Sequence, residues 1–317
     1  MLFEYYKAAR ETAAVVEQDW YGVIRLTGAD RVSWLQGMVT NDVQKLAAGQ
    51  GCYAAHLSPQ GKLVAHMLVL RDDDCLWLVL ERAAIPHLVS AFDKLLIMED
   101  VQIVDESQTL DIIGVLGPQA ASIVESWLGE SLQIEDEYGH RAFGDYRIVR
   151  TKLGHQVWVR HGVVDKVLRA VAQSGATAID RGTWDVLRTE AGWPIFGVDI
   201  DETTTMPELG EAGISYDKGC YIGQEVVAKI KYIGHVNRRF VGLLISGELL
   251  PQAKSPIRRG EKEVGYVTTS LFSPGLRQPI ALGFVARGAY SAGTEVEVLS
   301  KGRRIPAKIV DLPFAVH

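Results

Sequence analysis

The pattern over the last quarter of the chain limits the fold most. From residue 236 onward, short apolar runs alternate with turns rich in glycine, proline and serine, and no helical periodicity is visible. The runs are Arg239 to Ile245, Glu263 to Thr269, Ile280 to Val285, Thr294 to Leu299 and Ala307 to Val310. Runs of this length between turn residues are typical of antiparallel strands. The pattern predicts a small β-barrel or sandwich domain, which we place at residues 234–317.

Residues 1–233 combine hairpins with helices. The turn Ser58-Pro59-Gln60-Gly61 separates two strand-like runs, and Asp30 is a suitable N-cap for a helix over Arg31 to Gly37. Helical spacing is expected over residues 1–20, 85–96, 118–128, 163–173 and 184–190. We expect an α+β fold of antiparallel sheets with packed helices. No glycine-rich nucleotide loop follows a strand, so a nucleotide-loop enzyme is not expected.

Composition and charge narrow the functional classes. The chain has 317 residues and a net charge of −6, and its N-terminal stretch lacks the apolar core of a signal peptide. The apolar runs are too short to span a bilayer, so we expect a cytoplasmic protein without a membrane partner. Residues 218–260 hold eight basic and two acidic residues. This segment is either a patch for an anionic ligand or acidic partner, or an ordinary solvated surface. The acidic remainder argues against direct nucleic-acid binding.

The chain has three cysteines, Cys52, Cys75 and Cys220, with no Cys-x-x-Cys spacing. A disulfide framework or a cysteine-only metal site is therefore not expected. Cys52 and Cys75 lie in apolar runs typical of buried residues. Cys220 instead lies between glycines in Lys218-Gly-Cys-Tyr-Ile-Gly-Gln-Glu225, just before a segment that can form a short helix. Lys218 and a helix N-terminus both favour a thiolate, so Cys220 is the candidate reactive group and Lys218 its neighbour.

The octapeptide Lys218 to Glu225 resembles the signature of the YgfZ-like folate-binding proteins, which take part in iron–sulfur cluster assembly and repair. Their superfamily includes the T-protein of the glycine cleavage system, a tetrahydrofolate-dependent aminomethyltransferase. Further blocks are similar to the superfamily in the same order: Leu26–Asp30, Trp34–Gly37, Thr40–Val43, Glu190–Pro194, Ile280–Gly283 and Leu312–Phe314. The resemblance implies a T-protein-like fold with two interleaved α+β subdomains, the second at roughly 50–108, followed by the barrel.

The resemblance also implies site residues. Trp20 and Trp184 fall where YgfZ-like proteins place tryptophans implicated in folate binding, and flat aromatic faces suit a pterin ring. Taken alone, both would be core tryptophans. Glu208 matches a T-protein carboxylate that holds the pterin, or is an exposed loop glutamate. Arg238 and Arg239 would meet the glutamate tail of folate, or are surface charges of a strand. Glu225 is expected to be a first-turn helix residue.

One departure bears on the reaction. T-proteins use an aspartate in the strand after the glycine hairpin, where this chain has Ala65 and His66. This argues against an ordinary aminomethyltransferase. The first hypothesis is a tetrahydrofolate-binding accessory protein with iron–sulfur client or carrier proteins as partners. Cys220 would then be at most a transient cluster ligand, because clusters usually need four protein ligands. The alternatives are a folate-dependent one-carbon transferase, and a thiol hydrolase that pairs Cys220 with His235.

Overall fold

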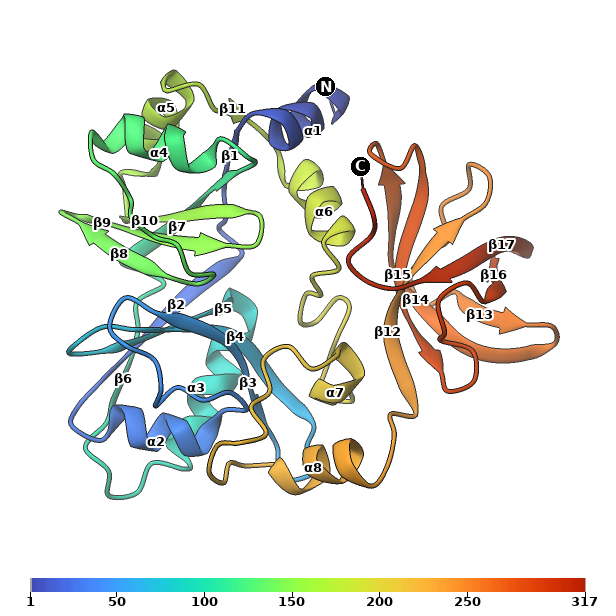
Figure 1. Cartoon of the computed structure of the whole chain (residues 1–317), viewed down its shortest axis with the longest axis horizontal. Coiled ribbons are helices and arrows are strands. Elements are labelled where there is room, and N and C mark those ends of the chain that lie inside the picture. The colour runs from blue at the N-terminus through green and yellow to red at the C-terminus, as the bar shows by residue number, and fades with distance from the viewer. Residues whose placement is uncertain (1, 317) are drawn as a thin grey trace. The chain divides into compact units, whose positions relative to one another are not determined.

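The computed structural model describes residues 2–316 and divides into two compact units. The first comprises the chain up to Arg181 together with Ala212–Gln224. The second comprises Gly182–Glu211 and the chain from Glu225 onward. Each unit has its own sheets and core, so we describe each by itself (Figure 1).

One antiparallel sheet of the first unit carries the hairpin expected from the sequence. Its five strands within the described residues run in the order β3-β4-β5-β2-β6. Their bounds are Gly51–Leu57 (β3), Leu63–Arg71 (β4), Leu76–Glu81 (β5), Tyr21–Thr27 (β2) and Gln102–Asp105 (β6). Helix α2 (Arg31–Met38), the 3-10 turn Arg82–Ala84 and helix α3 (Ile85–Asp93) belong to the same part of the chain. Apolar side chains such as Ile24 and Leu78 are fully buried in its core.

A second sheet of the first unit has six strands within residues 2–316, in the order β11-β1-β7-β10-β9-β8. Their bounds are Thr177–Ala178 (β11), Ala14–Glu17 (β1), Leu110–Leu116 (β7), Gly154–Arg160 (β10), Tyr146–Thr151 (β9) and His140–Phe143 (β8). Helices α4 (Ala120–Leu128) and α5 (Val164–Gln173) lie together on one side of it (Figure 1). Val124 and Val171 from these helices pack into the same core as Val115 and Val157 of the sheet.

The expected helix over the first twenty residues is wrong in its second half. Helix α1 ends at Glu11, and Ala14–Glu17 forms strand β1 between β7 and β11. The β-branched pair Val15 and Val16 fits a sheet better than a helix. Asp30 precedes α2 as expected, but its side chain makes no cap bond and instead accepts from the Asp100 amide at 2.9 Å.

The second unit contains the C-terminal barrel. Six strands of the described residues close in the order β12-β15-β14-β13-β16-β17. Their bounds are Arg238–Ile245 (β12), Gln278–Ala286 (β15), Lys262–Ser273 (β14), Pro256–Arg259 (β13), Glu295–Ser300 (β16) and Arg303–Val310 (β17). Alternate residues such as Leu243, Val267 and Val298 fill the interior. The C-terminal domain is thus a barrel and not a sandwich, and the predicted α+β class is confirmed.

Three helices precede the barrel strands along the chain: α6 (Arg181–Glu190), α7 (Met206–Leu209) and α8 (Gln224–Tyr232). Helix α7 begins with a capping box, in which the Glu208 carboxylate accepts from the Thr205 amide. In the part of the chain that the structure describes, every helix is too short or too polar to cross a bilayer.

Candidate functional site

Cys220 lies in an irregular loop directly before α8, and its side chain is exposed. The other two thiols have different surroundings. Burial raises the pKa of Cys52 and of Cys75 to about 12, so both stay protonated at neutral pH. Since the thiolate is the reactive form of cysteine, Cys220 is the best placed of the three for chemistry with a partner or reagent. Its functional role stays a prediction.

Lys218 is buried, although it stands two residues before the exposed thiol. Its Nζ donates to the carbonyl oxygens of Gln36, Val39 and Asn41 at 2.6, 2.7 and 2.8 Å. Desolvation lowers the pKa of Lys218 to about 8. A lysine ammonium has three N–H donors, and all three are used by the backbone. None is left for a bound ligand or a thiolate.

The two candidate tryptophans belong to different units. Trp20 precedes β2 in the first unit, and the Arg181 guanidinium lies 3.8 Å from the centre of its ring. One face of this indole is therefore occupied by a cation. Trp184, on α6 of the second unit, is only 2% exposed. That burial fits a core tryptophan, and the role of both residues in pterin binding stays a prediction.

Glu208 and Arg238 lie together in the second unit. Arg238 Nε donates to Glu208 Oε1 at 3.1 Å, and Arg238 Nη1 donates to the Tyr266 hydroxyl at 2.9 Å. The Arg238 guanidinium also lies 4.4 Å from the ring centre of Phe284. Glu208 is 7% exposed rather than an open loop residue. The pair thus links α7 to the barrel strands, and any contact with folate stays a prediction.

Arg239 differs from its neighbour Arg238. It is exposed, and its guanidinium lies 5.3 Å from the ring centre of Tyr290. Glu225 is in the first turn of α8, as expected, and pairs with Lys229 at 2.6 Å.

His235 contacts Arg287 rather than a carboxylate that could orient it as a base. This arrangement gives the thiol-hydrolase hypothesis no orienting group.

A row of polar side chains on the five-stranded sheet was not found from the sequence. The Tyr53 hydroxyl lies 2.8 Å from His66 Nδ1, and His66 Nε2 lies 3.2 Å from Glu81 Oε2. His66 and Glu81 are 3% and 6% exposed. Burial, with Glu81 nearby, raises the pKa of Tyr53. Within residues 2–316, Glu81 Oε1 is buried without a hydrogen-bond partner. We call Tyr53, His66 and Glu81 the polar row.

The polar row changes the interpretation of the departure at Ala65 and His66. Ala65 is fully buried, and β4 has no acid at this point. A carboxylate does lie on the neighbouring strand, because Glu81 ends β5 beside His66. Glu81 also pairs in register with Tyr21, the residue after Trp20. The alternation of β5 predicts which face Glu81 takes, but only the order of the strands shows that it meets His66.

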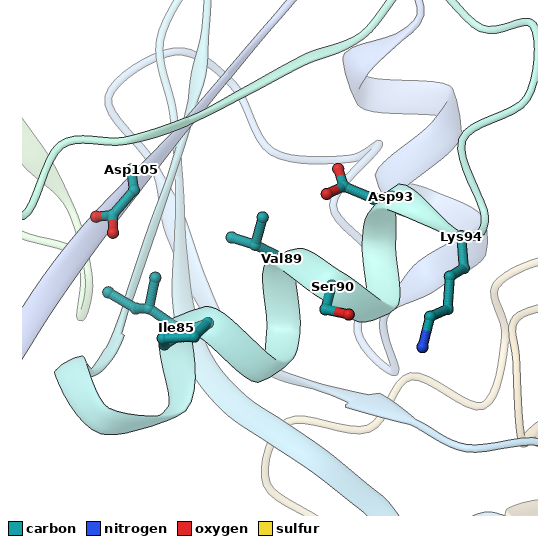
Figure 2. A pocket seen from close by; sticks show the side chains of 7 residues that line it. Ile85, Val89, Ser90, Asp93, Lys94 and Asp105 are labelled. Atoms are coloured by element: carbon teal, nitrogen blue, oxygen red, sulfur yellow. The ribbon is translucent and has the colours of Figure 1, made fainter.

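Two other places could hold a ligand. Asp72, Asp74 and Cys75 lie close enough to share a metal ion, but Asp72 already accepts from Arg147 and Trp77. A pocket of about 500 Å³ lies along α3, with Ile85 and Val89 between Asp105 and Asp93 (Figure 2). None of the residues expected to bind folate lines this pocket.

Comparison with known proteins agrees with the fold. Residues 3–215 match the GCVT N-terminal domain, and residues 238–315 match the glycine cleavage T-protein C-terminal barrel domain. An aminomethyltransferase of Nostoc sp. is 29% identical over 98% of this chain and 86% of its own length. One from Symbiobacterium thermophilum is 27% identical over 99% of this chain and 89% of its own length.

Among solved structures, the glycine cleavage system aminomethyltransferase T of Bartonella henselae superposes with a TM-score of 0.91. That likeness covers 99% of this chain and 89% of that chain at 20% identity, so it concerns the fold alone. The two domain matches together span most of the chain. The chain belongs to the glycine cleavage T-protein family.

Proposed function

We propose that the protein binds tetrahydrofolate beside the five-stranded sheet. The observation that carries the proposal is the polar row next to the Trp20 end of β2, where the buried Glu81 Oε1 has no hydrogen-bond partner among the described residues. A buried acceptor without a donor is costly, and a ligand rich in N–H groups would satisfy it. The aminopyrimidine part of a pterin offers such donors, and an indole offers a flat apolar contact. Family membership supports the same ligand.

Calorimetric titration with tetrahydrofolate tests this step. The variants Trp20→Ala and Glu81→Gln should each weaken binding by about tenfold, through a lost ring contact and a lost charged acceptor. Trp127→Phe, a tryptophan change on α4 against the other sheet, is the matched control and should bind as the parent protein does. Equal affinity in all four proteins would refute the proposed position of the folate.

Two functions of the bound folate are candidates. The first is an accessory role in iron–sulfur cluster assembly or repair, supported by the resemblance of the octapeptide and by the exposed Cys220. In cells, Cys220→Ala should lower the activity of client iron–sulfur enzymes while fold and folate affinity stay intact. Cys52→Ser, a substitution at a protonated and only partly exposed thiol, is the control. Full client activity in Cys220→Ala would argue against this role.

The second candidate is folate-dependent one-carbon transfer. The comparisons favour it, because the curated relatives bear the name aminomethyltransferase. The polar row supports it as well, since a buried Glu81–His66 pair can hold a proton that a transfer reaction needs to move. Incubation with 5,10-methylenetetrahydrofolate and an amine donor should then give turnover. Glu81→Gln should lower the turnover rate by about a hundredfold, whereas Cys220→Ala should leave it unchanged.

A further inference from the structure

The loop part of the octapeptide, residues 218–223 before α8, has two buried side chains with two exposed residues between them. Lys218 and Tyr221 are 8% and 7% exposed, whereas Gly219 and Cys220 between them are exposed. A cationic side chain is seldom buried unless it is paired or fully hydrogen-bonded. The burial of Lys218 therefore needs a local cause, and that cause lies in the segment from Gln36 to Asn41.

Three backbone carbonyls converge on the Lys218 ammonium. They belong to Gln36, Val39 and Asn41, at 2.6 to 2.8 Å from Nζ. The carbonyls face a cation with the negative ends of their dipoles, which makes charge-assisted hydrogen bonds stronger than neutral ones. We call this arrangement the Lys218 anchor. It joins two sequence blocks that are far apart along the chain.

Other bonds fasten the same two segments on either side of the anchor. The Ser215 amide donates to the Thr40 carbonyl at 3.0 Å, and the Thr40 hydroxyl donates to the Gly213 carbonyl at 2.6 Å. Beyond Cys220, the Ile222 amide donates to the Gly37 carbonyl at 3.2 Å. The loop is thus held before and after the exposed thiol, and the Lys218 anchor lies between these two attachments.

We propose that Lys218 is a positioning residue, which fixes the loop that presents Cys220 by binding the carbonyls of Gln36, Val39 and Asn41. Its ammonium group binds backbone carbonyls and does not stabilise the thiolate form of Cys220. The inference rests on the proposed function only for the role of Cys220. In this inference the lysine of the octapeptide maintains the conformation of the loop.

Hydrogen exchange tests the anchor in the whole protein. In Lys218→Met, which keeps an unbranched apolar side chain one atom shorter and removes the donors, exchange at the Ser215 and Ile222 amides should rise by about tenfold or more. Lys229→Met is the control, because the Lys229 side chain is exposed on α8 and its ammonium group bonds only to Glu225 among the described residues. Amides of β10 report whether the fold as a whole is intact. Unchanged exchange at both loop amides would overturn the proposal.

Alkylation of Cys220 by iodoacetamide at several pH values, followed by mass spectrometry, distinguishes a lysine that positions the loop from one that acts on the thiol by its charge. A loosened loop changes the alkylation rate by a similar factor at every pH. A pH profile displaced in Lys218→Met, with both loop amides still protected, would mean that the lysine acts by its charge and would overturn the proposal.

Lys218→Gln keeps two N–H donors without the charge, so it serves if the methionine variant does not fold. Its loop amides should exchange at a rate between that of the parent protein and that of a loop without the anchor. A rate equal to that of the parent protein would count against the anchor. Neither readout involves folate or iron–sulfur clients. Failure of the proposed function in Cys220→Ala would therefore be distinguishable from failure of this inference.

Discussion

At the residue scale, the buried charges of this protein are held by networks, and Asp199 is an example. Its carboxylate accepts from Arg188 at 2.6 Å and from the hydroxyls of Thr268 and Thr269 at 2.7 Å each. Asp199→Ala should lower the free energy of unfolding by about 3 to 5 kcal/mol, because it removes the fully buried carboxylate that pairs with the buried Arg188 guanidinium. Urea denaturation measures the change. Asp185→Ala removes a more exposed partner of Arg188 and should cost under about 1 kcal/mol. Equal losses in the two variants would contradict this account.

At the element scale, the loop that carries Cys220 depends on one of its two glycines. Gly223 has a φ of +83°, and a Cβ there would lie 2.7 Å from the Ser58 carbonyl oxygen. At Gly219 nothing lies within 4 Å of such a Cβ. Gly223→Ala should therefore destabilise the protein by about 1 to 3 kcal/mol, whereas Gly219→Ala should change stability by less than about 0.5 kcal/mol. Thermal unfolding of both variants checks the contrast. A tolerated Gly223→Ala would show that the turn can shift.

At the scale of the whole molecule, buried histidines make stability depend on pH. Burial, assisted by Arg150, lowers the pKa of His155 from 6.5 to about 4. The unfolded chain therefore binds this proton near pH 6.5 and the folded chain only near pH 4. The free energy of unfolding should fall by up to about 3 kcal/mol as the pH drops through this window. Urea denaturation at several pH values measures it. His155→Gln should show a smaller loss, and an unchanged slope would exclude His155 as the cause.

Much of the fold follows from local patterns. The turn at Ser58–Gly61 predicts the β3–β4 hairpin, and the short runs after residue 236 predict strands of the barrel. Local patterns failed at Ala14–Glu17, where strand pairing with β7 outweighs the helical context of the preceding residues. They also failed at Asp30, whose carboxylate bonds to the distant Asp100 amide instead of capping its own helix. Both errors come from partners far away in the sequence.

The candidate site divides in the same way. The sequence by itself marks Cys220 as an accessible thiol between glycines, because turn residues and polar neighbours keep it out of a core. Only the tertiary structure shows that Lys218 binds three carbonyls in and just after the last turn of α2, and that Glu81 meets His66 across neighbouring strands. A side chain's chemical type and local flexibility are properties of its own segment. Its partners depend on which strands and loops pack together. Burial then determines whether a charged group binds the backbone or is accessible to a ligand.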